Sequence, residues 1–208
     1  MEKEYYDAQI KYINEIRSIK HDIQAHMIVL QYYLESENYE KAKAYLCDMK
    51  RNQKCESVVI QDTGSDLVNA IVSDTLGRSE CKIDFEVEGL LPENFFMNEY
   101  DTCTLFSNVF SNACEACEKL VDEKPMIRMQ VKEAKETYSI VIQNPIEWKI
   151  QVDQFGLLTS KEDKEEHGFG TKNMIHAVKK CGGKIDFSIA ENCFQVQITY
   201  AKERVQEI

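Results

Sequence analysis

The chain has 208 residues and a formal net charge of −11, and 43% of its residues are hydrophobic and 29% charged. This composition is typical of a soluble globular protein with at least one hydrophobic core. The acidic balance and the lack of a Lys/Arg cluster argue against nucleic acid as a partner, because phosphate backbones need a basic surface. No apolar run is long enough to span a bilayer, so no transmembrane segment is predicted and no direct membrane contact is expected.

The eight cysteines do not have the spacing of a disulfide framework. Cys114 and Cys117 form one Cys-x-x-Cys pair on a predicted helix, and no second pair accompanies it. A zinc site is therefore disfavoured. Reduced thiols within the core are expected instead, as in proteins of a reducing compartment.

Residues 5–34 are predicted to form one long helix. Its apolar residues recur at a mean spacing of ~3.5, the period of helical bundles and coiled coils. They are Ile13, Ile16, Ile19, Ile23, Met27, Leu30 and Leu34. The polar residues 35–38 indicate a turn, and 39–57 a second helix. Because a two-helix hairpin cannot bury its apolar stripe alone, we expect residues 1–60 to form a homodimeric four-helix bundle.

Residues 61–208 show helix and strand patterns in alternation. Three helices are expected, at 66–79 with Ser65 or Asp66 as cap, at 99–120 and at about 171–181. Alternating apolar and polar residues predict strands at 83–89, 126–131, 138–143, 184–189 and 194–200, the last two as a hairpin. A long polar stretch covers 149–170. These elements fit an α/β sandwich with helices on one face of the sheet.

His21 and Asp22 lie on the first predicted helix, in the sequence IKHDIQAHM. His21 lies about 150° from the centre of the apolar stripe, so it is expected to face outward. One interpretation is an ordinary exposed polar residue. The other is chemical, because neutral imidazole is a competent nucleophile and a neighbouring carboxylate can orient the ring or accept its proton. His26 lies nearer the stripe and is expected to be structural.

Asn108, Asn112 and Glu115 share one face of the helix predicted at 99–120, whose remaining positions are largely apolar. Asparagine is unfavourable inside helices, so two of them one turn apart form either a plain polar face or part of a site. Carboxamide oxygens can bind a hard cation such as Mg²⁺, and carboxamide NH₂ groups can contact phosphate oxygens.

Two further segments are candidates. HGFGTKNM (167–174) places Gly168 and Gly170 at the start of a helix, where the backbone can approach a phosphate and helix N–H groups are free. An ordinary loop explains these glycines equally well. IQNPIEW ends a strand at Asn144, just before Pro145, and turn formation alone is sufficient to explain that pair.

The order of these motifs resembles the catalytic region of sensor histidine kinases, over essentially the whole chain. It is similar above all to the peptide-pheromone quorum-sensing branch, which has a histidine box like KHDIQAH followed by a helical hairpin like LQYYLESENYEKAKAYL. The same branch has an N box like residues 108–116, and an Asn where IQNPI has Asn144. An STK-like segment, here Thr159 to Lys161, then precedes HGFG.

The resemblance implies a fold and a function. Residues 1–60 would be the dimerisation and histidine phosphotransfer hairpin, and 61–208 an ATP-binding domain of the GHKL or Bergerat type. His21 would accept the γ-phosphoryl group of ATP, with Asp22 as base or orienting group. The phosphoryl group would then pass to an aspartate in the receiver domain of a response regulator. Residues near 58–65 would be the hinge.

The resemblance also implies an ATP site. Its residues would be Asn108, Asn112, Asn144, Lys161, Gly168, Phe169 and Gly170. Asn112 would coordinate Mg²⁺, with Asn108 beside it near the phosphates. Asn144 would meet the adenine amino group, and the two glycines would belong to the mobile segment over the phosphates.

Two departures from the family pattern stand out. Ala25 lies four residues after His21, where family members often have Asn or Thr that helps a water attack the phosphorylated partner, so weak phosphatase activity is expected. The segment GFGT lacks the Leu that often follows the glycines. The resemblance also implies a cytoplasmic location, as part of a longer membrane-anchored sensor.

Two other functional classes remain as alternatives. A non-catalytic phosphorelay or nucleotide-sensing module would have the hairpin but a poor ATP site, which Asn108, Asn112 and the glycines argue against. A structural coiled-coil dimer would not need the strand-rich part after residue 60.

Overall fold

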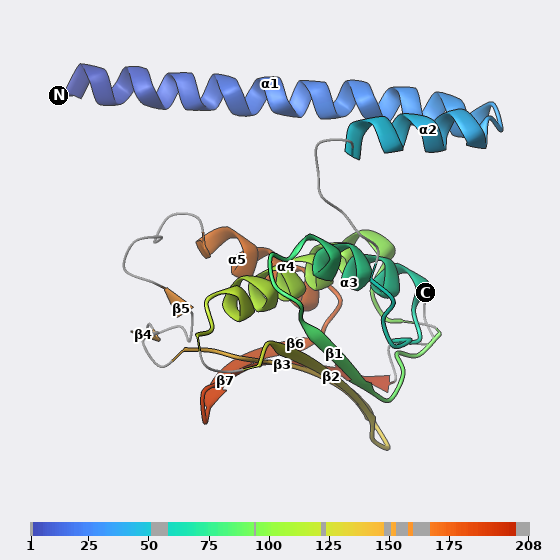
Figure 1. Cartoon of the computed structure of the whole chain (residues 1–208), viewed down its shortest axis with the longest axis vertical. Helices are drawn as coiled ribbons and strands as arrows, with labels where there is room; N and C mark the ends of the chain where they lie inside the picture. The colour runs from blue at the N-terminus through green and yellow to red at the C-terminus, as the bar shows by residue number, and fades with distance from the viewer. Residues whose placement is uncertain are drawn as a thin grey trace. The chain divides into compact units, whose positions relative to one another are not determined.

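A computed structural model describes residues 2–50, 58–93, 95–121, 124–147, 151–152, 158–159 and 167–202 (Figure 1). Contacts divide the chain into two compact units, Met1–Lys54 and Cys55–Ile208. We call them the hairpin unit and the sheet unit. No helix within the described ranges is long and apolar enough to cross a membrane.

The hairpin unit consists of α1 (Glu2–Glu35) and α2 (Tyr39–Lys50). The turn between them contains Glu37 with a φ of 54°, and the Asn38 N–H donates to the Tyr33 carbonyl at 2.8 Å. His26 Nδ1 lies 2.7 Å from the Tyr45 hydroxyl, so His26 joins the two helices. These contacts confirm the two predicted helices, the turn between them and the structural role of His26. Residues 51–57 of the second predicted helix lie outside the described residues.

The apolar stripe of α1 is exposed in the single chain. Ile16 is 48% exposed, Ile23 53% and Met27 65%. A helix with an unburied apolar face is stable only when that face packs on something else. The four-helix bundle therefore stays a prediction. The exposed apolar stripe of the single chain is the reason to expect it.

The sheet unit is a mixed sheet with three helices on one face (Figure 1). Its helices are α3 (Asp66–Arg78), α4 (Glu99–Glu118) and α5 (His167–Lys180). Its main strands are β1 (Asp84–Glu88), β2 (Met126–Glu133), β3 (Thr137–Pro145), β6 (Lys184–Ala190) and β7 (Cys193–Ala201). The strand order is β1-β2-β3-β7-β6, with β1 parallel to β2 and every other pair antiparallel.

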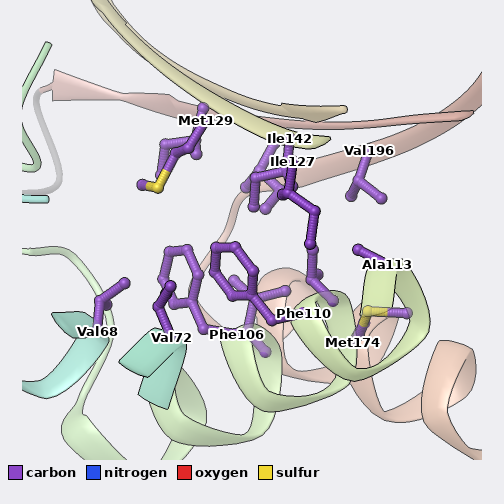
Figure 2. Close-up of a cluster of buried hydrophobic side chains, with 14 of the residues drawn as sticks. Val68, Val72, Phe106, Phe110, Ala113, Ile127, Met129, Ile142, Met174 and Val196 are labelled. Atoms are coloured by element: carbon purple, nitrogen blue, oxygen red, sulfur yellow. The ribbon is translucent and has the colours of Figure 1, made fainter. Parts of the chain in front are cut away.

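The core lies between the sheet and the helices. Ile127, Met129 and Ile142 are buried and point from the strands toward Phe106 and Phe110 of α4 (Figure 2). Successive strand residues point to opposite faces, so the alternation in the sequence already separates these side chains from their polar neighbours. The predicted α/β sandwich is thus the fold of this unit.

Cys114 and Cys117 are buried in this core, as expected from their apolar neighbours. Burial raises the pKa of the Cys114 thiol to about 12 and that of Cys117 to about 11. Both are therefore protonated thiols at neutral pH, and they pack as small apolar side chains.

One boundary and one segment differ from the predictions. α5 begins at His167 rather than near 171, so both glycines of HGFG lie inside its first turn. The polar stretch before it contains two short paired strands that its composition did not predict, β4 (Gln151–Val152) and β5 (Leu158–Thr159).

The stretch 58–65, the predicted hinge, is part of the sheet unit and is hydrogen-bonded within it. The Ser73 hydroxyl donates to the Val58 carbonyl at 2.8 Å. Thr63 is fully buried, and its N–H and hydroxyl both donate to Asn69 Oδ1, at 2.9 and 2.7 Å. A swing within this stretch would break these bonds, and the hinge between the units stays a prediction.

Candidate functional site

α4 forms the middle of the helical layer, because it packs on α3, on α5 and on β3. Asn98 caps it by accepting from the Asp101 N–H at 2.8 Å. Its apolar residues face the sheet, whereas Asn108 is half-buried and Asn112 and Glu115 are exposed. The predicted polar face is therefore real, and it lies along the side of α4 that is turned away from the core.

Two contacts fix how α4 and α5 lie together. Lys180 near the end of α5 donates to the Asp101 carboxylate near the start of α4 at 2.7 Å. At the other end of the pair, the first turn of α5 approaches Asn108, because a Cβ built on Gly170 would lie 2.7 Å from Asn108 Oδ1. The helices therefore run antiparallel, and the glycine turn meets the asparagine face.

Asn108 is held by its own helix as well. Its Nδ2 donates to the Thr104 carbonyl one turn earlier, at 2.6 Å. The carboxamide therefore has a defined orientation, with the nitrogen toward α4 and the oxygen toward Gly170. Asn112, one turn further on, is exposed and points from the same face.

Asn144 lies next to the last residue of β3, on the face of the sheet that carries the helices. It is only 4% exposed, and it follows Ile140 and Ile142 in the buried alternation. Its Nδ2 donates to the Pro145 carbonyl at 3.0 Å. This bond uses the nitrogen of the carboxamide, so the oxygen is the end that can accept from a ligand.

Phe194 is a site residue that the sequence did not indicate. It lies directly opposite Asn144 in the β3–β7 register, and Ile189 of β6 lies opposite Phe194. Phe194 is half-buried, and its ring stacks on Phe187 at 6.2 Å with 9° between the ring planes. A polar carboxamide thus lies beside an apolar surface. No local pattern signals this, because strand register between distant segments sets it.

The first turn of α5 lies toward this same end of the sheet. α5 packs on β6 and leads into it through the turn at Gly182, so the two elements run in opposite directions. Their lengths also match, because α5 has 14 residues that rise ~1.5 Å each and β6 has 7 residues that rise ~3.3 Å each. The start of α5 therefore lies toward the end of β6 that meets Phe194. Asn108, Asn144, Gly170 and Phe194 come from four elements and gather at one end of the sheet unit.

His21 belongs to the hairpin unit. Its side chain is 82% exposed, and Nδ1 lies 3.5 Å from Asp22 Oδ1. The carboxylate lies on the Nδ1 side of the ring. Because the apolar stripe of α1 is also exposed in the single chain, the orientation of His21 away from a bundle stays a prediction. Asp22 is itself 66% exposed, so this contact is a weak one in water.

Other predicted residues are only partly described. Lys161 lies outside the described residues, and Gly168 and Phe169 are described only as part of α5. A separate cavity of about 320 Å³ lies against Arg128 and Gln143, which point to the open face of the sheet. Its lining includes Asn144 but none of the other predicted site residues.

Comparisons with known proteins give one family match and several similar solved structures. The family profile described as the GHKL domain matches residues 97–201. No curated protein matches the chain. Similar solved structures include the catalytic domain of the histidine kinase ThkA, at 18% identity and a TM-score of 0.44 over 65% of this chain and 93% of that one. Another is the histidine kinase AdeS of Acinetobacter baumannii, at 11% identity and a TM-score of 0.47 over 87% and 97%. A third is the histidine kinase domain of the Erythrobacter litoralis blue-light-activated kinase EL346, at 14% and 0.45 over 77% and 70%. Because the GHKL profile covers half of the sequence, including α4, the end of β3 and α5, the chain belongs to the GHKL domain family.

Proposed function

We propose that this protein is an ATP-dependent protein histidine kinase that phosphorylates itself on His21. The observation that carries the proposal is the meeting of the Asn108/Asn112 face with the glycine turn of α5, inside a GHKL domain. An exposed His-Asp pair on a separate helical unit supplies the acceptor.

The adenine base would bind beside Asn144. The Asn144 oxygen would accept from the adenine amino group, while the Phe194 side chain would offer an apolar surface to the ring. Base–aromatic contacts of this kind contribute about 1–3 kcal/mol. Two observations support this arrangement: Asn144 lies opposite Phe194, and the Asn144 Nδ2 donates to the Pro145 carbonyl.

The phosphates would extend toward the asparagine face and the start of α5. Helix N-termini favour anions, and the glycines there let the backbone approach closely. Mg²⁺ binds in such sites through one or two protein oxygens together with substrate phosphates and water. The exposed Asn112 carboxamide suits that role. Lys161, Gly168 and Phe169 stay candidates for contacts with the same phosphates.

The chemistry at His21 is an in-line phosphoryl transfer. With Asp22 beside Nδ1, an Nδ1–H would donate to the carboxylate, and Nε2 would be the nucleophile. Nε2 bonds to the γ-phosphorus as the bond to the β,γ-bridging oxygen breaks, and ADP leaves. The Nδ1 proton can pass to Asp22 or to water as charge builds on the ring.

The further implications of the resemblance belong to this proposal. The hairpin would dimerise, and a response regulator would accept the phosphoryl group from His21. The chain would act in the cytoplasm as part of a longer membrane-anchored sensor of the quorum-sensing branch. These points stay predictions, and the exposed stripe of α1 supports the dimer in particular.

A labelling experiment tests the proposal. The protein is incubated with Mg²⁺ and γ-labelled ATP, and the label is tested for loss in acid and retention in base, as expected of phosphohistidine. The matched variants are His21→Ala and His26→Ala, since the latter removes a histidine that packs on α2 instead. Label in the wild type and in His26→Ala, with none in His21→Ala, is the expected result.

The alternatives give different results. A phosphorelay module would take no label from ATP but would exchange it with a phosphorylated regulator. A structural dimer would do neither. Equal labelling of His21→Ala would refute the assignment of the acceptor.

A further inference from the structure

Gly170 lies in the first turn of α5 in an ordinary helical conformation. The described glycines with positive φ are Gly64, Gly89 and Gly182, and Gly170 is not one of them. Any residue could adopt its backbone conformation, and alanine would favour the helix more than glycine does. The conformation therefore does not explain why a glycine stands here.

The space around Gly170 does explain it. A Cβ at this position would lie 2.7 Å from Asn108 Oδ1 and 3.6 Å from Asn108 Cγ. The first distance is too short for a real contact. The Asn108 oxygen thus occupies the place where a side chain of residue 170 would begin.

Asn108 cannot move away without a loss. Its Nδ2 donates to the Thr104 carbonyl at 2.6 Å, and rotation of the carboxamide would break that bond. The half-buried position of Asn108 limits replacement of the bond by water. Its orientation therefore depends on two features. The Thr104 carbonyl accepts a hydrogen bond from its nitrogen, and the absence of a side chain at Gly170 leaves room for its oxygen.

We propose that Gly170 is a positioning residue that acts through Asn108. Its missing side chain lets the Asn108 carboxamide lie against the first turn of α5, and this contact fixes both the orientation of Asn108 and the approach of the two helices. The use of that orientation in nucleotide binding rests on the proposed function, whereas the packing itself does not.

Thermal unfolding of the full chain without nucleotide tests the packing. Gly170→Ala is introduced into the wild type, into Asn108→Ala and into Asn112→Ala. In the wild type we expect the Tm to fall by about 2–4 °C. In Asn108→Ala the same change should raise the Tm, because only the helix preference for alanine remains. Asn112→Ala is the matched control and should behave like the wild type.

A second readout follows Asn108 directly. The side-chain amide signals of Asn108 and Asn112 in a ¹H–¹⁵N spectrum are identified by their disappearance in the corresponding alanine variants. Gly170→Ala should shift the Asn108 pair and leave the Asn112 pair in place. An unmoved Asn108 pair, together with the same Tm change in all three backgrounds, would overturn the proposal.

Titration with ATP and Mg²⁺ separates this inference from the proposed function. Gly170→Ala should weaken binding about tenfold or more in the wild type and no further in Asn108→Ala. If the Tm effect of Gly170→Ala depends on Asn108 but the wild type does not bind ATP, the packing is supported and the function is refuted. If the wild type binds ATP but Gly170→Ala changes the Tm equally in the wild type and in Asn108→Ala, the packing is refuted and the function is supported. Equal weakening in both backgrounds would contradict the orientation of Asn108 by Gly170.

Discussion

Asn144 and Phe194 are the two residues that would form the proposed base site. Asn144 is buried yet polar, and burying an amide without a partner costs about 1–3 kcal/mol. One of its N–H groups donates to the Pro145 carbonyl, and Phe194 lies next to it across the strand pair. This is one defined hydrogen-bonding group on an apolar surface, as small-molecule sites commonly have.

Replacing Asn144 with alanine should weaken ATP binding about 10–100-fold, since a hydrogen bond in a desolvated site is lost. Binding of inosine triphosphate, which lacks the amino group, should change much less. The dissociation constants of both nucleotides, measured by calorimetry for wild type and variant, check this. Equal weakening for the two nucleotides would show that Asn144 does not read the amino group.

Ala25 is exposed on α1, one turn after His21 and on the same side. It has no group that could orient a water, so we expect slow dephosphorylation of the response regulator. Ala25→Asn should raise the rate of regulator dephosphorylation. The decay of phosphorylated receiver domain with each protein measures this, and an unchanged rate would refute it.

At the level of elements, α4 and α5 are clasped by Asp101 and Lys180. Asp101 is 4% exposed, and the hydrogen bond from Lys180 holds the pKa of its carboxyl below the usual value. The same pair raises the pKa of Lys180, whose side chain is about half exposed. The clasp lies at the far end of the helix pair from Gly170, so the two contacts link α4 and α5 at separate points along their length.

Asp101→Asn should lower the free energy of unfolding at neutral pH by about 1–3 kcal/mol, because the charged bond is lost. The wild type has this contribution in full above the unfolded carboxyl pKa of ~3.9, and it disappears as the pH falls through the lower folded pKa. The variant should therefore lose less stability between neutral and acid pH. Urea unfolding at several pH values measures both, and parallel pH curves would contradict the clasp.

The elements themselves were largely predictable, whereas their contacts were not. Phe106, Val109 and Phe110 recur with the helical period, so α4 and its polar face follow from local spacing. The contact between Asn108 and Gly170 depends on how two helices cross that are distant in sequence. The start of α5 was missed because glycines usually indicate a loop.

At the scale of the whole molecule, the stripe of α1 is an apolar surface that the single chain leaves exposed. Ile16 and Ile23 are about half exposed in the single chain, although their spacing is that of a bundle seam. A second copy of the hairpin would bury both. The net charge of −11 opposes association, so apolar burial has to provide the stability of a dimer.

Ile16→Glu should give a monomer under conditions in which the wild type is a dimer, because the charge would enter a buried seam. Ser18→Glu is the matched control, since it places the same charge on the outward side, near His21. Light scattering after gel filtration measures the molar mass of each. A dimeric Ile16→Glu, or a monomeric wild type, would contradict the bundle.

The most direct test of the central claim is to locate the phosphoryl group on the chain after reaction with ATP and Mg²⁺. Peptide mapping by mass spectrometry at neutral to basic pH, where phosphohistidine survives, gives the position. The account predicts a single modified residue, His21, in the wild type and none in Asn112→Ala. A phosphoryl group on another residue, or an unmodified wild type that binds ATP, would contradict it.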